Sequence, residues 1–160
     1  MTLEEQKLRD ENVAHLGPRQ GYQNKVWDEF VRLAPLHGDK AIMDAILDFH
    51  PSPGIASSQY RFDLLKILTR DPVFFVNSVD RHFAGNLDCS IHWLLPPSRL
   101  IGLFELDQPV KKALQSDPSQ ALLKKFLLRS QEQAKSIESR TDSPLKLAGC
   151  GLNSPKSAGK

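Results

Sequence analysis

The stretch from residue 57 to residue 83 constrains the fold most strongly, because it is the densest apolar part of the chain and is divided once, by Asp71-Pro72. Aspartate can accept hydrogen bonds from the free N–H groups of a helix's first turn, and proline at the first helical position loses no helical hydrogen bond. Asp71-Pro72 therefore predicts the end of one helix and the start of the next.

Both halves of this stretch carry apolar residues at the spacing of one helical face. The residues expected to face inward are Tyr60, Leu64, Ile67 and Leu68 in the first helix and Phe75, Val76, Val79 and Phe83 in the second. Gly85 is the expected stop of the second helix. The sequence thus predicts two packed helices as the core.

Proline, glycine and capping residues divide the rest of the chain into short segments. They predict further helices over residues 2–16, 24–34, 38–49, 87–95, 109–115 and 118–139. Pro35, Pro96-Pro97 and Pro109 are each expected to bound a helix. The apolar run 100–104 is too short for periodicity to separate helix from strand. Residues 140–160 are rich in Ser, Pro, Gly and Lys, which predicts a disordered basic tail.

One internal echo suggests a repeat. The pattern of residues 64–72, which ends in Asp71-Pro72, recurs at residues 110–118, which end in Asp117-Pro118. A spacing of 46 residues (110 minus 64) fits helical-hairpin repeats, but Asp-Pro is a common helix start and so short a match also arises by chance. In architecture alone the pattern resembles HEAT-type repeats. We expect an all-α domain of about five to eight helices over residues 1–139, in an irregular or short HEAT-like array.

Charge is distributed unevenly along the chain. Residues 1–110 hold 11 Lys/Arg and 15 Asp/Glu, a net of −4, whereas residues 111–160 hold 10 and 4, a net of +6. Such a basic region suits an acidic protein, another polyanion or an anionic membrane surface, and it also suits a solvated helix face and tail. The candidate binding residues are Lys111, Lys112, Lys124, Lys125 and Arg129.

Motifs for catalysis are weak. Cys89 and His92 stand three residues apart and could form a thiolate–imidazolium pair on one helix face, although a small buried cysteine is the commoner explanation of Cys89. A bridge between Cys89 and Cys150 is conceivable in an exported protein. Of the carboxylate pairs, Glu105 with Asp107 is the least ordinary, and a loop or cap role is expected for it. Phosphate-binding glycine loops and zinc-ligand spacings are absent, so no cofactor or metal is expected.

These observations favour a non-enzymatic helical domain that binds another protein or itself. The alternatives are a small cysteine-dependent hydrolase using Cys89 and His92, and polyanion binding through the basic region; generic nucleic acid is disfavoured because few aromatic residues accompany those charges. The chain contains no apolar window approaching the roughly 18 residues of a membrane span. The cytoplasm is the expected compartment, and export stays open if a signal peptide was removed.

Overall fold

The computed structural model describes residues 1–14, 16, 25–49, 55–95, 99–139 and 142–150. Within these residues the chain forms eight helices and no strand, which confirms the all-α prediction. The helices are α1 (Leu3–Asn12), α2 (Lys25–His37), α3 (Lys40–Leu47), α4 (Ile55–Arg70), α5 (Pro72–His82), α6 (Asp88–Leu94), α7 (Arg99–Ser116) and α8 (Ala121–Ser139). None of the described helices combines the length and the apolar character that crossing a bilayer requires.

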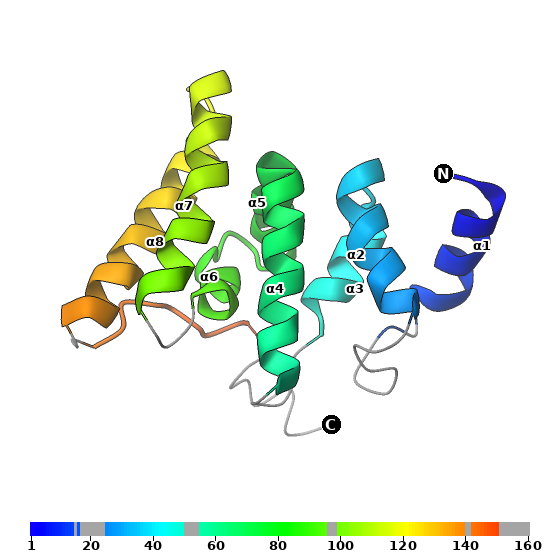
Figure 1. Cartoon of the computed structure of the whole chain (residues 1–160), viewed down its shortest axis with the longest axis horizontal. Coiled ribbons are helices and arrows are strands. Elements are labelled where there is room, and N and C mark those ends of the chain that lie inside the picture. The colour runs from blue at the N-terminus through cyan, green and yellow to red at the C-terminus, as the bar shows by residue number, and fades with distance from the viewer. Residues whose placement is uncertain (15, 17–24, 50–54, 96–98, 140–141, 151–160) are drawn as a thin grey trace.

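Consecutive helices pair, and the pairs stand in a row. α2 contacts α3, α4 contacts α5, and α7 contacts α8. α4 also lies between α2 and α7, while α5 contacts both α3 and α8, so the pairs form one layer of α2, α4 and α7 and a second layer of α3, α5 and α8. Figure 1 shows this row along the longest axis, with α1 at one end and α7 and α8 at the other.

The centre of the row is the core expected from the sequence. The four predicted inward residues of α4 are buried, as are Phe75, Val76 and Val79 of α5. Phe83, also expected to face inward, follows the last residue of α5 and is only partly buried. Phe75 is fully buried and its ring meets Phe126 of α8 edge-on, with centroids 6.3 Å apart. These contacts join the middle pair of helices to the last pair.

The two Asp-Pro junctions differ. Asp71 caps α5, because its carboxylate accepts the Phe74 N–H at 3.0 Å and Pro72 is the first helical residue. Asp117 instead accepts the backbone N–H of Ser119 at 3.1 Å, and the Ser119 hydroxyl at 2.6 Å. This turn delays the start of α8 to Ala121, so the helix start expected at residue 118 is wrong. The repeat itself stays a prediction.

Two prolines expected to bound helices lie inside them. Pro35 is buried within α2, and Pro109 lies in the middle of α7, so no new helix begins at Gln108-Pro109. An internal proline costs one helical hydrogen bond, and the packing of each helix against its neighbours offsets that cost. Pro96-Pro97 lies outside the described residues.

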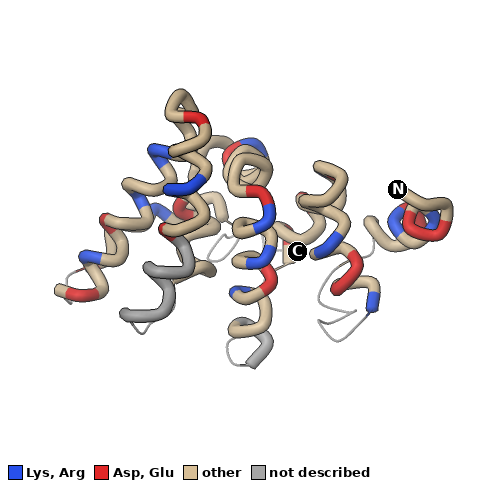
Figure 2. The backbone as a smooth tube through the Cα atoms, turned by 45° about the horizontal axis from the view of Figure 1, so that its top comes forward, with Lys and Arg blue, Asp and Glu red and all other residues tan. Residues whose placement is uncertain are grey.

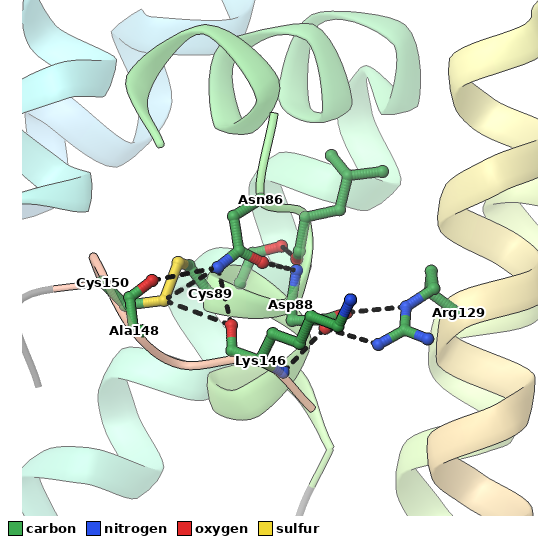
Figure 3. The surroundings of a disulfide bond; sticks show 9 residues. Asn86, Asp88, Cys89, Arg129, Lys146, Ala148 and Cys150 are labelled. Atoms are coloured by element: carbon green, nitrogen blue, oxygen red, sulfur yellow. Dashed lines mark hydrogen bonds and ion pairs between the residues drawn. A yellow bond between two sulfur atoms is a disulfide. The ribbon is translucent and has the colours of Figure 1, made fainter. Parts of the chain in front are cut away.

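Residues 142–150 do not behave as the disordered tail expected from residue 140. After α8 they run across α6, where the Lys146 carbonyl accepts a hydrogen bond from Asn86 Nδ2 at 2.6 Å (Figure 3). Cys150 forms a disulfide with Cys89, with their Cα atoms 5.4 Å apart. The structure thus makes the bridge that the sequence left open, and residues 151–160 lie outside the described part.

Candidate binding face on α4

α4 has an outer stripe as well as a buried one. Its buried residues pack into the core, whereas the residues of the outer stripe recur every three to four positions and therefore share a side of the helix. This outer stripe consists of Gln59, Phe62, Lys66, Thr69 and Arg70. We use the name α4 face for this stripe together with the residues of α2 and α7 that line the clefts on either side of it, which are described next.

Three adjoining clefts lie on the α4 face. One of about 800 Å³ lies between the C-terminal end of α4 and α7, and one of about 420 Å³ lies between α2 and α4. A third, of about 870 Å³, runs along α4 itself over Phe62 and Leu65. Arg70 lines all three, so the clefts form one continuous hollowed surface.

The cleft between α4 and α7, which we call the α4–α7 cleft, is cationic. Arg70, Lys111 and Lys112 line it, and none of its described lining residues is a carboxylate. Arg70 and Lys112 have no ion-pair partner within the described residues, whereas Lys111 Nζ lies 3.5 Å from an oxygen of Asp107. Figure 2 shows α4 and α7 as neighbours that both carry Lys or Arg.

The α2–α4 cleft, on the other side of α4, carries charges of both signs, because Arg32, Lys66 and Arg70 line it together with two carboxylates. Asp28 of α2 and Asp63 of α4 both line the α2–α4 cleft. Asp63 is buried; its carboxylate accepts hydrogen bonds from Trp27 Nε1 at 2.7 Å and from Gln59 Nε2 at 3.1 Å. Lys66 Nζ lies 3.5 Å from the same carboxylate. The two sides of α4 therefore differ: carboxylates accompany the cations of the α2–α4 cleft, whereas the described lining of the α4–α7 cleft has cations alone.

Phe62 is the apolar element of the face. It remains 48% exposed, although the other large apolar side chains described on this helix are buried. The buried Arg61 guanidinium stands over its ring, 5.1 Å from the centroid, and Arg61 Nε donates to the Leu94 carbonyl at 3.1 Å. The ring is thus supported from beneath and offers an apolar surface to solvent.

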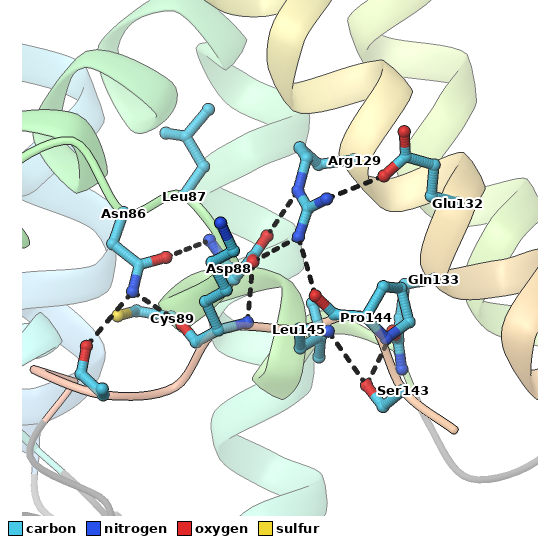
Figure 4. A network of polar contacts seen from close by, with 12 residues as sticks. Asn86, Leu87, Asp88, Cys89, Arg129, Glu132, Gln133, Ser143, Pro144 and Leu145 are labelled. Carbon is cyan, nitrogen blue, oxygen red and sulfur yellow. Dashed lines mark hydrogen bonds and ion pairs between the residues drawn. The ribbon is translucent and has the colours of Figure 1, made fainter.

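The structure separates the five basic residues predicted for binding. Lys111 and Lys112 lie beside Arg70 in the α4–α7 cleft, while Lys124 and Lys125 are exposed on α8. Arg129 is engaged in a structural network instead, because it holds Asp88 and donates to the Pro144 carbonyl at 3.0 Å (Figure 4). Arg70 and Phe62, which complete the site, were missed by the sequence reasoning; their signal is their position outside the inward stripe of α4.

The proposed catalytic pair does not form in this structure. Cys89 is buried and its sulfur is bonded to Cys150, so it has no free thiol. His92 is exposed, and its ring meets that of Trp93 edge-on at 5.3 Å. Within the described part of the chain, no three His, Cys, Asp or Glu residues are grouped so that they could hold a metal ion.

The carboxylates at positions 105 and 107 belong to the interior of α7, so the expected loop or cap role was wrong. Asp107 is buried, and its Oδ1 has no hydrogen-bond partner within the described residues. The continuous helix removes the free N–H groups that a cap would satisfy. The side chain of Glu105 lies outside the described residues.

His82, the last residue of α5, connects this helix to α3. Its Nε2 lies 2.8 Å from Oδ1 of Asp48, which follows the last residue of α3, and its Nδ1 lies 3.1 Å from Oδ1 of Asp44, in the middle of α3. The hydrogen bond with Asp48 is the main cause that raises the pKa of His82 above its ordinary value, against the opposing effect of burial. His82 is not among the residues that line the three clefts of the α4 face.

Comparison of the chain with protein-family models, with curated proteins and with solved structures gives no match. The function is therefore inferred from the residues of this chain.

Proposed function

We propose that this protein is a non-enzymatic protein-binding domain and that it binds its partner through the α4 face. The observation that carries this proposal is the set of three clefts that share Arg70 and surround the exposed ring of Phe62. Partner surfaces in protein complexes are built from an apolar anchor bounded by polar and charged side chains. Phe62 supplies such an anchor, and Lys66, Arg70 and Lys112 supply the boundary.

The layered arrangement supports the same function. Helices in a row bury their inner faces against each other and leave a long outer face open, and helical arrays use such faces for partners. α2, α4 and α7 form one such layer, and α4 is its middle helix. A ligand on α4 can therefore also contact a helix on each side.

Site-specific photocrosslinking tests the proposal. A benzophenone amino acid replaces Phe62 in one variant and Leu128 in the other; Leu128 is an apolar residue of α8 that is 60% exposed. We expect a partner from expressing cells to crosslink at position 62 and not at position 128. The recombinant partner should then bind at least tenfold more weakly to Phe62→Ala than to Leu128→Ala. Equal crosslinking at both positions, or equal affinities, would overturn the proposal.

A further inference from the structure

The charges of the α4 face identify the kind of partner that fits it. Resting on the proposed function, we infer that the occupant is an extended acidic segment of a partner protein, with a bulky apolar side chain on Phe62 and carboxylates in the α4–α7 cleft. The apolar and cationic parts belong to one surface, because the clefts that contain them share Thr69 and Arg70.

The α4–α7 cleft is suited to anions. Two of its cations, Arg70 and Lys112, have no partner within the described residues, so their charge is available to a ligand. Its other polar groups include Gln108 and Gln115, which can donate hydrogen bonds to carboxylate oxygens. Lys111 contributes less, because Asp107 already faces it.

The distance between the apolar and cationic parts sets the spacing of the ligand. Phe62 and Arg70 are eight positions apart on α4, and a helix rises about 1.5 Å per residue, so they are separated by about 12 Å. An extended chain advances about 3.3 Å per residue. The apolar residue and the first carboxylate of the ligand should therefore stand three to four residues apart.

The mixed charge of the α2–α4 cleft argues against a nucleic acid. Asp28 and Asp63 stand among the cations of the α2–α4 cleft, and a strand of evenly spaced phosphates crossing α4 would have to approach these two carboxylates. Only one exposed aromatic ring, Phe62, lines the described clefts, whereas binding of single strands relies on several stacking platforms. A short segment with its charge at one end avoids both difficulties.

Fluorescence anisotropy of labelled 12-residue peptides tests the inference on the full chain. The probes carry Leu and a Glu-Glu pair separated by three residues, in both orders, and the controls replace Glu-Glu with Lys-Lys or Leu with Ser. We expect at least one Leu/Glu-Glu probe to bind at least tenfold more tightly than either of its controls, and its affinity to fall as salt rises. Phe62→Ala should weaken this binding at least tenfold.

Reversing the charge of two cleft residues shows whether the peptide contacts them directly or responds only to the net charge of the protein. Arg70→Glu combined with Lys112→Glu should weaken the Glu-Glu probe at least tenfold and strengthen the Lys-Lys control, whereas Lys124→Glu combined with Lys125→Glu on α8 should change neither by more than threefold. Thermal unfolding of each variant verifies folding; if the Arg70/Lys112 pair variant unfolds, Arg70→Gln and Lys112→Gln are used.

The outcomes distinguish this inference from the proposed function. If no probe binds in a manner that depends on Phe62 and Arg70, if the Lys-Lys probe binds as well, or if a 12-nucleotide single strand binds more tightly, the inference is wrong. The crosslinking contrast between positions 62 and 128 tests the proposed function separately, and it can succeed with a neutral or basic partner segment.

Discussion

Arg129 of α8 holds both carboxylate oxygens of Asp88 at the start of α6, with Nε 3.0 Å from Oδ1 and Nη2 2.5 Å from Oδ2. The Lys146 backbone N–H donates to the same carboxylate at 2.8 Å. Asp88 is buried, and its contacts join three segments that are far apart in the sequence (Figure 4). This arrangement makes Asp88 the polar centre of the end of the molecule that contains α6 and α8.

Arg129→Ala should therefore destabilise the protein by about 3 kcal/mol, because it leaves a buried carboxylate without its cation. Lys125→Ala, at an exposed position of the same helix, is the matched control and should change the free energy of unfolding by less than about 0.5 kcal/mol. Denaturant unfolding monitored by circular dichroism measures both. Equal effects of the two substitutions would show that the Asp88 network contributes little.

Reduction of the Cys89–Cys150 disulfide should also destabilise the fold. The two cysteines are 61 residues apart, and closing a loop of this size lowers the entropy of the unfolded chain enough to stabilise the native state by roughly 4 kcal/mol. Unfolding with and without dithiothreitol measures the difference. The Cys89→Ser, Cys150→Ser double variant should resemble the reduced protein and should not respond to dithiothreitol.

The two Asp-Pro junctions should respond differently to alanine. Asp71→Ala removes the side-chain cap of α5 and should cost about 1 kcal/mol. Asp117 is exposed and its carboxylate serves a turn that precedes α8, so Asp117→Ala should cost only a few tenths of a kcal/mol. Thermal unfolding of the two variants, side by side, checks the order. An Asp117→Ala effect as large as that of Asp71→Ala would contradict it.

Histidine 82 should make stability depend on pH with a defined sign. Its pKa is raised in the folded protein, chiefly by the hydrogen bond with Asp48, so the folded state binds the proton more tightly than the unfolded state. The resulting stabilisation is complete below the unfolded value of about 6.5 and is lost as the pH rises through the higher folded pKa. Asp48→Asn should reduce this loss, and NMR titration of the imidazole should show a lower pKa in that variant. An unchanged His82 pKa would contradict the role given to Asp48.

The sequence predicts the structure correctly where helical spacing and capping rules favour the same arrangement as the contacts between helices. The inward stripe of α4 and the Asp71 cap follow from helical spacing and capping chemistry, and both appear in the structure. Gly85, expected to end α5, adopts φ +88°, in the left-handed region that glycine enters at little cost. Such signals depend on only a few neighbouring residues.

The remaining features depend on contacts between distant segments. Pro109 lies inside α7, and its effect is outweighed by packing against α8 and α4, which no local rule reveals. The sequence places Arg129 among the basic residues expected to bind a partner. Its ion pair with Asp88 is not visible there, because Asp88 precedes it by 41 residues. For the α4 face, the outer stripe could have been read as the complement of the inner one. Its combination with Lys111 and Lys112 required the placement of α7.

The hydrogen bond from Trp27 Nε1 to Asp63 gives the protein an intrinsic optical reporter. The emission of an indole responds to nearby charge, and the buried Asp63 carboxylate lies between Trp27 and Lys66. A ligand that draws Lys66 away from Asp63 would change the electric field at Trp27, where the low dielectric of the interior strengthens that field. Trp93, the second tryptophan of the chain, instead meets Tyr60 edge-on with centroids 5.2 Å apart. Occupancy of the α4 face can therefore be followed by fluorescence without any added label.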